Sequence, residues 1–553
     1  MKFRYTLFSA IALGVLGGVQ TVYSQIDRNV EVVKAYVPNI EPTDKLALVP
    51  DMSDDSYIMP DIDYSITPVS VESTFDLTHY KASTMNFTEY TSYPHYYLKL
   101  GAGLPLQSVV DLYASSFNVD QSFVMGYFNQ SGRYANIDND FGVEHSGSSQ
   151  SHFRGGVAAG TYVGQRGKML RGELRYRSDL WSRYATMCDS DYSHPLYQSG
   201  GAQVEFGDDF VSLSGVDYAL RGGVNYFWDR ADYSSTSYNL EAQFAGMIGS
   251  GKLLGSVGFE GISAADGSIS NSTFTIGANY SKYGEKFRFE FGAKYYGDDL
   301  SLAGSAEGYI VPRLMLDYNI ASTKFVGYVD LDGGLLYNDF GGLSEVNPYL
   351  ALGSYGDRNT MLYDLDLGLK GAILKGALSY NVYFDYDITT ANRYWTFVGS
   401  ASELNNYFVL SLSDMTKVGA SVELEYIPRS NTTIRLEASL ANYIDNDAQI
   451  VANGMASGVA RLSWEQRLGK LSLTLLGDYR SSREVTVMDS STLEVGNRTL
   501  GAEFDMGVSL NYRLSDRFFI FGDVRNIFNA DIYDWAYYRE YGVNFMAGIK
   551  VQF

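Results

Sequence analysis

The sequence has little cysteine, histidine or basic charge, and each shortage excludes a class of protein. One cysteine, Cys188, excludes a disulfide framework and a cysteine-based zinc site. The five histidines show no metal-binding spacing such as HExxH. Lys and Arg number 42 against 64 acidic residues, and the formal net charge of −22 disfavours nucleic-acid binding. We therefore expect no cofactor, no metal, no catalytic residues and no nucleic-acid partner.

Long hydrophobic runs are also missing after residue 24. Residues 7–19 form the one sustained apolar stretch, which is shorter than the roughly 18 residues of a membrane-spanning helix. Lys2 and Arg4 precede it, and Val22-Tyr23-Ser24 follows it. This three-part pattern predicts a secretory signal peptide over 1–24, cleaved between Ser24 and Gln25.

Proline is scarce and unevenly placed. The chain has 11 prolines, and Pro38, Pro42, Pro50, Pro60, Pro68 and Pro94 all precede residue 95. The same region is acidic, with Asp51, Asp54, Asp55, Asp61 and Asp63 close together. We expect residues 25–94 to be an extended or partly disordered periplasmic segment. There are two alternatives for this segment: it docks on a partner as a strap, or it forms a divalent-cation site.

Aromatic residues and glycine are abundant, with 46 Tyr and 56 Gly, and from about residue 95 apolar and polar residues alternate. The C-terminal stretch is the clearest case. Its apolar positions are Tyr541, Val543, Phe545, Ala547, Ile549, Val551 and Phe553. Since successive side chains of a strand point to opposite faces, such stretches predict strands with one apolar face.

Short and long connections alternate between these strands. Short breaks lie at 164–167, 250–251, 283–285, 374–376, 428–431, 467–469 and 515–516, and long polar segments lie near 132–149, 181–199, 338–360 and 388–413. This rhythm is typical of an outer-membrane barrel with tight periplasmic turns and longer outer loops. Residues 95–553 are therefore predicted to form an all-β, transmembrane, antiparallel up-and-down barrel of about 22 strands, with a range of 18–24. A soluble β-sandwich or propeller is the alternative.

The end of the chain resembles the barrel of a TonB-dependent receptor. Asn526, Ile527, Phe528 and Asn529 match the Asn-Leu-Phe-Asn-like stretch of the family's penultimate strand, and a glycine-rich last strand ends in Phe553. The resemblance implies a Gram-negative outer-membrane location, contact with outer-membrane lipids, and insertion by the barrel-assembly machinery. The 70 or so residues of 25–94 are too few for the family's plug and show none of its motifs, which leaves engagement of TonB open.

Charged residues on the polar face of the predicted strands would point into the lumen, since charges are costly against lipid. These candidates are Arg171, Glu173, Arg175, Arg177, Arg288, Glu290, Lys294, Glu423, Glu425, Arg435, Glu437, Asp478, Arg480, Glu503, Asp505 and Arg513. They form either a wall network or a selective filter. A barrel of this width needs filling by inward loops, by 25–94, or by a partner such as a periplasmic or surface lipoprotein.

Two functional hypotheses follow from this sequence. The first is a plugless, receptor-like barrel that moves a solute or peptide across the outer membrane. The second is a non-transporting structural or assembly component of an outer-membrane complex. A surface adhesin that uses the long loops is a weaker third.

Overall fold

The computed structural model describes residues 95–553 apart from gaps at 119–121, 139, 141–143, 146–147, 165–167, 186–193, 209, 211–214, 301–306, 322–323, 400–406 and 446–453. The predicted signal peptide with its Ser24/Gln25 cleavage site, and the predicted segment 25–94, lie outside the described residues.

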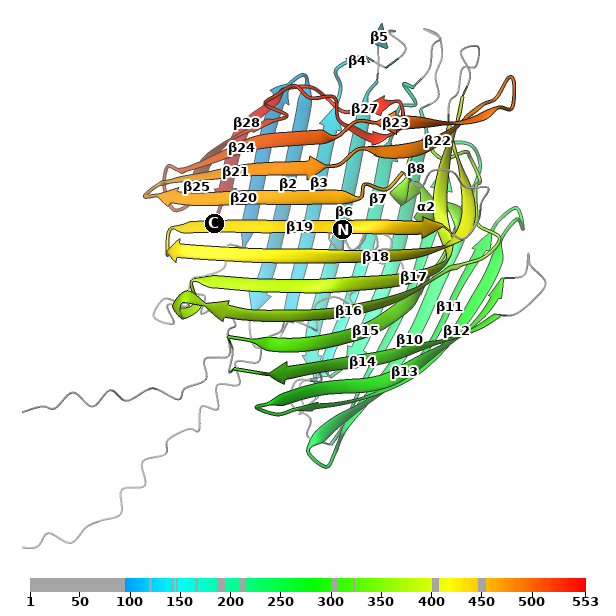
Figure 1. Ribbon diagram of the computed structural model, residues 1–553, viewed down its shortest axis with the longest axis vertical. Coiled ribbons are helices and arrows are strands. Elements are labelled where there is room, and N and C mark those ends of the chain that lie inside the picture. Colours follow the sequence, from blue (N-terminus) through cyan, green and yellow to red (C-terminus); the bar gives the residue numbers. More distant parts are fainter. Residues whose placement is uncertain are drawn as a thin grey trace, which may run out of the picture.

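Twenty-two antiparallel strands form a closed barrel (Figure 1). Its first half comprises β1 (Tyr96–Leu104), β2 (Gln107–Asn118), β3 (Ser122–Arg133), β6 (Gln150–Val163), β7 (Lys168–Leu180), β8 (Leu196–Gly207), β9 (Val216–Asp229), β10 (Ser234–Ile248), β11 (Gly251–Ala264), β12 (Ser270–Tyr283) and β13 (Phe287–Leu300). Its second half comprises β14 (Glu307–Asn319), β15 (Val326–Leu336), β16 (Thr360–Ile373), β17 (Leu378–Gly399), β18 (Tyr407–Arg429), β19 (Thr432–Asp445), β20 (Gly458–Leu468), β21 (Leu471–Arg480), β24 (Glu503–Arg513), β25 (Phe518–Arg525) and β28 (Asn544–Gln552). The predicted fold class and strand number are confirmed.

The ring closes between the first and last strands. Leu98 pairs with Val551, Leu100 with Ile549, and Ala102 with Ala547. Each of the remaining wall strands pairs with the wall strand that follows it in sequence, so the topology is up-and-down throughout. Each wall strand is therefore hydrogen-bonded to a neighbour on both sides, which a strand-built structure needs in lipid.

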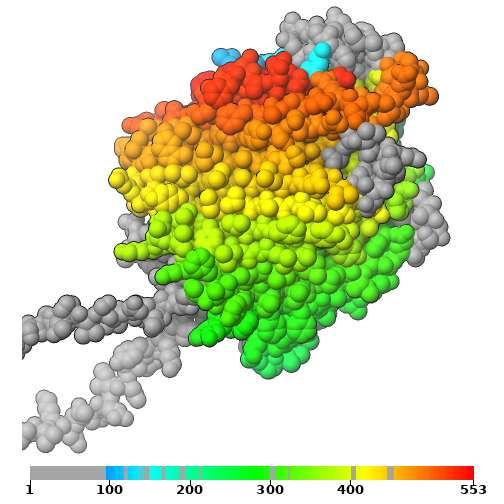
Figure 2. All heavy atoms as spheres, in the orientation of Figure 1, coloured from blue at the N-terminus to red at the C-terminus, as the bar shows by residue number. Residues whose placement is uncertain are grey.

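Alternation explains why these segments form a wall. On β7, Leu170 and Leu174 are 40% and 65% exposed, and arginine and glutamate occupy the positions between them. The same rhythm leaves large apolar side chains exposed on strand after strand, as at Phe291, Ile310 and Leu440. We call this side of the wall the apolar face and the other side the polar face. A continuous exposed apolar band of this kind is suited to lipid. Figure 2 shows the strands packed side by side in chain order along this flank.

The two ends of the barrel differ. At one end, the turn end, links such as 249–250, 430–431 and 469–470 join the strands. At the other, the loop end, the connections 134–149, 181–195 and 337–359 are long, as predicted. The predicted long loop at 388–413 is wrong. β17 and β18 run on as a strand pair to Gly399 and from Tyr407, because a bulge between Thr389 and Asn392 keeps them paired through the polar sequence.

Small elements occupy the loop end. They are β4 (Ile137–Asp138) with β5 (Glu144–His145), α2 (Phe340–Val346), β22 (Arg483–Asp489) with β23 (Val495–Leu500), and β26 (Tyr533–Trp535) with β27 (Tyr538–Arg539); a short 3-10 turn, η1 (Leu374–Gly376), lies at the turn end. Asp339 caps α2 by accepting a hydrogen bond from the Gly342 N–H. β22 pairs in parallel with the tip of β17, where Phe397 meets Val487. In the described part of the chain, no helix is both long and apolar enough to span a membrane.

Candidate functional site: the covered loop end and the polar face

The loops of the loop end share one hydrophobic core. Its buried members come from seven connections and the strand tips beside them: Ile137, Tyr184, Ala185, Tyr197, Phe227, Tyr233, Ile262, Ala264, Ile269, Phe340, Leu343, Tyr349, Leu350, Phe397, Phe408, Val485, Leu500, Ala536, Tyr538 and Tyr541. The loops are therefore packed on one another across the opening rather than extended into solvent.

The connection 337–359, which we call the lid, crosses the opening from β15 to β6–β8. Tyr197 on β8 donates a hydrogen bond to the Pro348 carbonyl at 2.9 Å. Arg183, just past β7, donates to the Leu350 carbonyl at 2.5 Å, and Arg177 on β7 pairs with Glu345 of α2. The lid is thus anchored to β8 and β7, which lie seven and eight places from β15 around the ring.

The last connection, 526–543, meets the lid at the centre. The rings of Tyr349 and Tyr538 stack with centroids 3.5 Å apart, and Tyr184 donates to the Arg539 carbonyl at 2.9 Å. Tyr541 lies in this core at 6% exposure and donates to the Ala135 carbonyl. The prediction that Tyr541 begins the lipid-facing C-terminal strand is wrong, because β28 begins at Asn544. Val543 precedes the strand too, whereas Phe545, Ala547, Ile549 and Val551 lie in it and Phe553 follows it.

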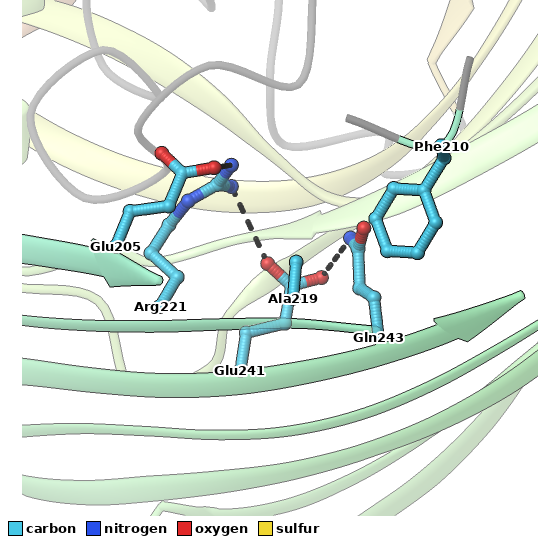
Figure 3. Close-up of a pocket in the computed structure, with 6 residues that line it drawn as sticks. All are labelled: Glu205, Phe210, Ala219, Arg221, Glu241 and Gln243. Carbon is cyan, nitrogen blue, oxygen red and sulfur yellow. Dashed lines mark hydrogen bonds and ion pairs between the residues drawn. The ribbon is translucent and has the colours of Figure 1, made fainter. Parts of the chain in front are cut away.

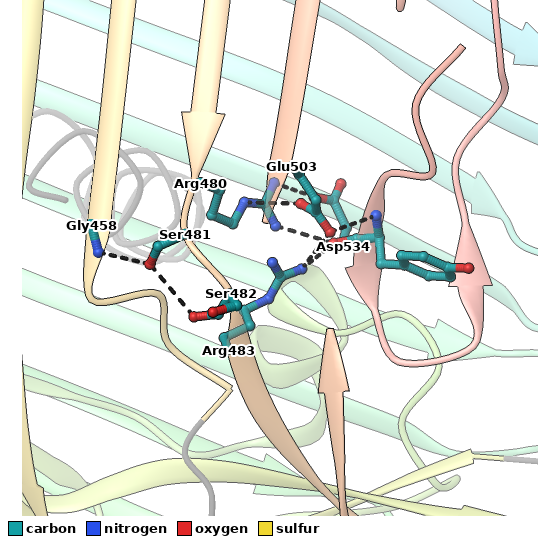
Figure 4. Close-up of polar contacts among 8 residues, drawn as sticks. Gly458, Arg480, Ser481, Ser482, Arg483, Glu503 and Asp534 are labelled. Carbon is teal, nitrogen blue, oxygen red and sulfur yellow. Dashed lines mark hydrogen bonds and ion pairs between the residues drawn. The ribbon is translucent and has the colours of Figure 1, made fainter. Parts of the chain in front are cut away.

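Two arginines and a glutamate hold the last connection to the wall (Figure 4). Glu503 of β24 lies 3.4 Å from the Arg480 Nε and 3.2 Å from the Arg483 Nη2, and it accepts from the Tyr533 N–H at 3.0 Å. Arg480 also reaches Asp534 at 3.3 Å. Arg480 and Glu503, both in the predicted set of lumen charges, therefore bind each other and hold the connection 526–543 against the wall.

The receptor-like stretch 526–529 forms a turn directly after β25 rather than part of the strand. Asn526 and Asn529 have left-handed backbone angles, φ 48° and 53°, which asparagine tolerates. The Asn526 side chain donates to the Ala530 and Tyr541 carbonyls at 2.8 and 3.2 Å, and Asn529 accepts from the Val543 N–H. Ile527 and Phe528 are 36% and 62% exposed. The two asparagines thus fasten both ends of the last connection.

Burial shifts the titration of groups in this covered region. Burial raises the pKa of the Tyr184 and Tyr349 hydroxyls well above their usual range. Burial also raises the pKa of the Asp339 carboxyl, although the Gly342 N–H and the nearby Arg393 charge act in the opposite direction. The lid is therefore seated in a poorly hydrated environment.

The predicted lumen charges lie on the polar face, and many pair across neighbouring strands. The pairs between neighbouring strands are Glu290 with Arg313, Arg435 with Glu425 and Glu465, and Asp478 with Arg461. Local pairs join Arg171 with Glu173, Arg177 with Asp179, and Arg513 with Asp516, and Arg177 also pairs with Glu345 of α2. Glu423 accepts from Asn381, and Asp505 accepts from the Asn526 N–H. Arg175, Arg288, Lys294 and Glu437 occupy the same face by alternation.

A grid of six aspartates on β15–β17 was missing from the predicted set. Asp332, Asp364 and Asp387 are successive cross-strand neighbours, and so are Asp330, Asp366 and Asp385. Lys417 of β18 closes one side, with its Nζ 2.5 Å from Asp385 and 2.8 Å from Asp387. Arg313 of β14 closes the other side through Asp330 and Asp332. The signal was present as three Asp-x-Asp repeats in alternating stretches.

A second cluster lies nearer the turn end (Figure 3). Arg221 of β9 reaches Glu205 of β8 at 3.2 Å and Glu241 of β10 at 3.5 Å, and Gln243 donates to Glu241 at 2.8 Å. These residues line a small pocket with Phe210 and Ala219. In the regions that the structure covers, no group of three or more His, Cys, Asp or Glu side chains is arranged to hold a metal ion.

Several solved structures share this fold. The FrpB iron transporter from Neisseria meningitidis matches with a TM-score of 0.63 and 10% identity, over 83% of this chain and 81% of that one. The ferripyoverdine receptor of the outer membrane of Pseudomonas aeruginosa matches at 0.59 and 11%, over 83% and 72%. The chain has the barrel fold of the TonB-dependent receptors.

Two further receptor-fold matches agree with this result. The copper transporter OprC matches at a TM-score of 0.60 with 12% identity, over 83% of this chain and 81% of that one. The ferric-catecholate import receptor Fiu from E. coli matches at 0.60 with 10%, over 83% and 82%. No family model and no curated protein sequence matches this chain. At these identities the likeness concerns the fold, and the resemblance expected from the C-terminal residues is confirmed at that level.

Proposed function

We propose that this protein is an outer-membrane transport barrel that carries a solute or peptide, with the loop end facing outward and the lid controlling access. The observation that carries the proposal is the combination of a receptor-type 22-strand barrel with a loop end covered by its own loops. Such a covering is what a wide barrel needs if the outer membrane is not to leak.

The polar face supplies the passage in this proposal. Arg or Lys against lipid at midplane costs roughly 2–4 kcal/mol, so the sixteen predicted charges and the aspartate grid line the bore. Their cross-strand pairs stiffen the wall, and their mixed signs keep the bore hydrated. The apolar face, ending near Phe553, contacts outer-membrane lipids.

Biogenesis completes the proposal. The signal over 1–24 directs export and is removed before Gln25, and residues 25–94 remain in the periplasm. The last strand, with Phe553 at its end, is the element that the barrel-assembly machinery engages. The proposal leaves engagement of TonB open.

The named neighbours are transporters and receptors, which supports a role without catalysis. The covered loop end also fits the second hypothesis, a non-conducting component of an outer-membrane complex. A barrel that is closed at rest and holds fixed partners would serve as a scaffold.

Conductance in planar bilayers tests the proposal. The purified protein is compared with a variant in which 337–359 is replaced by a short glycine-serine turn, which the direct pairing of Leu336 with Thr360 permits. We expect small currents from the native protein and large, steady currents from the lidless variant. The control replaces the tip 490–494 of the β22–β23 hairpin, where Leu493 is 71% exposed, and should behave as the native protein.

A silent lidless variant that remains folded would overturn transport. Co-purification of stoichiometric partner proteins, identified by mass spectrometry, would then establish the scaffold hypothesis.

A further inference from the structure

The wall is not paired along its full height between β14 and β15. Their ladder holds six residue pairs, from Asn319 with Val326 to Leu314 with Leu331. Above it, β14 continues to Glu307 and stays paired with β13, and β15 continues to Leu336 and stays paired with β16. In Figure 1 the two strands part toward the loop end. The sheet therefore has a seam on its loop-end side.

The two sides of the seam overlap. Val311, on the polar face of β14, packs with Leu335 of β15 and Met361 of β16, which lie on the apolar face of their strands. These three side chains are 2%, 7% and 0% exposed. An apolar face can rest on a polar face of the same sheet only where one edge has turned inside the other. The upper parts of β15 and β16 therefore lie on the bore side of β14.

Three backbone groups at the seam and at the end of the ladder bond to side chains. Asp332 accepts from the Gly333 N–H at 2.8 Å, Arg313 donates to the Leu331 carbonyl at 3.4 Å, and Tyr363 donates to the Ile310 carbonyl at 3.4 Å. Pro312, which has no N–H, lies on the edge of β14. These side chains and Pro312 therefore support the parted arrangement of the seam.

Glycine is required at the crossing. A Cβ at Gly333 would lie 2.2 Å from the Leu362 carbonyl oxygen and 3.0 Å from the Val311 side chain. The Leu362 carbonyl of the neighbouring strand β16 therefore excludes a side chain at this position, and Val311 of the outer layer leaves little room for one.

The inward part has a hinge and an anchor. Beyond the Thr389/Asn392 bulge of β17, where Ala391 has φ 51°, the distal arms of β17 and β18 continue over the opening. Thr360 ties the start of β16 to the Ala391 carbonyl at 2.6 Å. Asn359 anchors the lid to the wall by donating to Asp298 of β13 at 2.8 Å.

We propose that this inward-turned part of the wall is the gate of the barrel. The gate consists of residues 332–363 with the distal arms 392–399 and 407–413, and it pivots at the end of the β14–β15 ladder and at the β17 bulge. This inference rests on the proposed transport function, and it assigns the moving part to the wall strands themselves rather than to the loops alone.

A thiol crosslink between gate and wall tests the proposal. Asp298→Cys and Asn359→Cys are introduced together after Cys188→Ser, and the thiols are joined by oxidation or by a short bifunctional reagent. The uncrosslinked protein lacks the anchor, so its open probability in KCl across a planar bilayer should rise about tenfold or more over Cys188→Ser alone, as expected for the loss of one hydrogen bond to a carboxylate. Crosslinking should return it to the closed level.

The matched control places Ala438→Cys and Ala460→Cys on neighbouring strands β19 and β20, where these two residues pair directly within an unbroken ladder. Its crosslink should change nothing. Hydrogen exchange supplies a second readout, because a moving gate exposes the amides of 307–313 and 332–336 and the crosslink protects them.

Equal currents and equal exchange in the crosslinked and uncrosslinked anchor variant would overturn the gate. If the lidless variant still conducts in that case, transport survives and the gate alone fails. If the lidless variant is silent while the exchange responds to the crosslink, the wall moves but the transport proposal fails.

Discussion

At the scale of single residues, Lys417 holds the aspartate grid together. Its side chain is 9% exposed and contacts Asp385 and Asp387, whose side chains are 4% and 17% exposed. Removing one partner of a buried charge group costs about 3–5 kcal/mol, because the opposite charge is left uncompensated. We expect Lys417→Met to lower the thermal unfolding temperature of the barrel in detergent markedly, as followed by the loss of β-sheet circular dichroism.

Lys370→Met is the matched control for this change. Lys370 also pairs with an aspartate, Asp317, at 3.1 Å, but its side chain is 42% exposed. A half-exposed pair contributes about 1 kcal/mol or less. Equal losses from the two substitutions would contradict the role of burial in the grid.

The sequence predicted the face of the strand on which a residue lies better than it predicted the residue's contacts. The strand alternation indicated the polar face, and hence Glu503 and Arg480. Their convergence on Tyr533 depends on a loop that lies 30 positions from Glu503 and 53 positions from Arg480 in sequence. Tyr541 continues the alternation of β28 perfectly in sequence, yet it packs in the loop core. Periodicity cannot report where a strand stops when the next apolar residue is buried by a distant loop.

At the scale of elements, the lid has a built-in pH response. Because burial raises the Asp339 pKa above its usual 3.8, the seated lid holds this proton at a pH where the released lid has lost it. The seated state is therefore favoured at low pH, and this contribution is lost as the pH rises from about 3.8 through the raised value. Hydrogen exchange of the 340–346 amides, corrected for intrinsic rates, should show growing lid release across that range.

Asp339→Asn isolates this effect. Asparagine keeps an acceptor for the Gly342 N–H but has no proton to release, so the part of the pH dependence that comes from position 339 should disappear. The other charged groups that hold the lid, Arg177 and Glu345 among them, are the same in both proteins, so the comparison isolates position 339. An unchanged pH profile in the variant would show that another group controls the lid.

Elements were the level at which sequence patterns succeeded most. Turn-end links and three of the four predicted long connections lie where expected, since turn residues and alternation act locally. The segment 388–413 was predicted as a loop because its composition is polar. It forms strands because its β17 and β18 parts pair with each other, and because they also pair with β22 and with the lid. The β14–β15 seam has one indication in the sequence, Pro312, which cannot donate a ladder hydrogen bond. Its link to the seam can be recognised only once the partner strand is known.

At the scale of the whole molecule, closure depends on the last strand. We expect deletion of 544–553 to prevent the heat-modifiable, fast-migrating form of the barrel on SDS gels, because both β1 and β25 lose their β28 partner. Phe553→Ala is the milder comparison, because it removes the terminal ring and its contact with Tyr96 but leaves the ladder intact. A truncated chain that still ran as a compact band would contradict the observed closure.

The parted seam has a consequence for the surrounding bilayer. A complete cylinder resists lateral pressure evenly, whereas this one has a seam at which two layers of wall overlap. In the proposed gate, membrane thickness and tension act at this seam, so we expect the lipid composition of the outer leaflet to set how readily the protein opens.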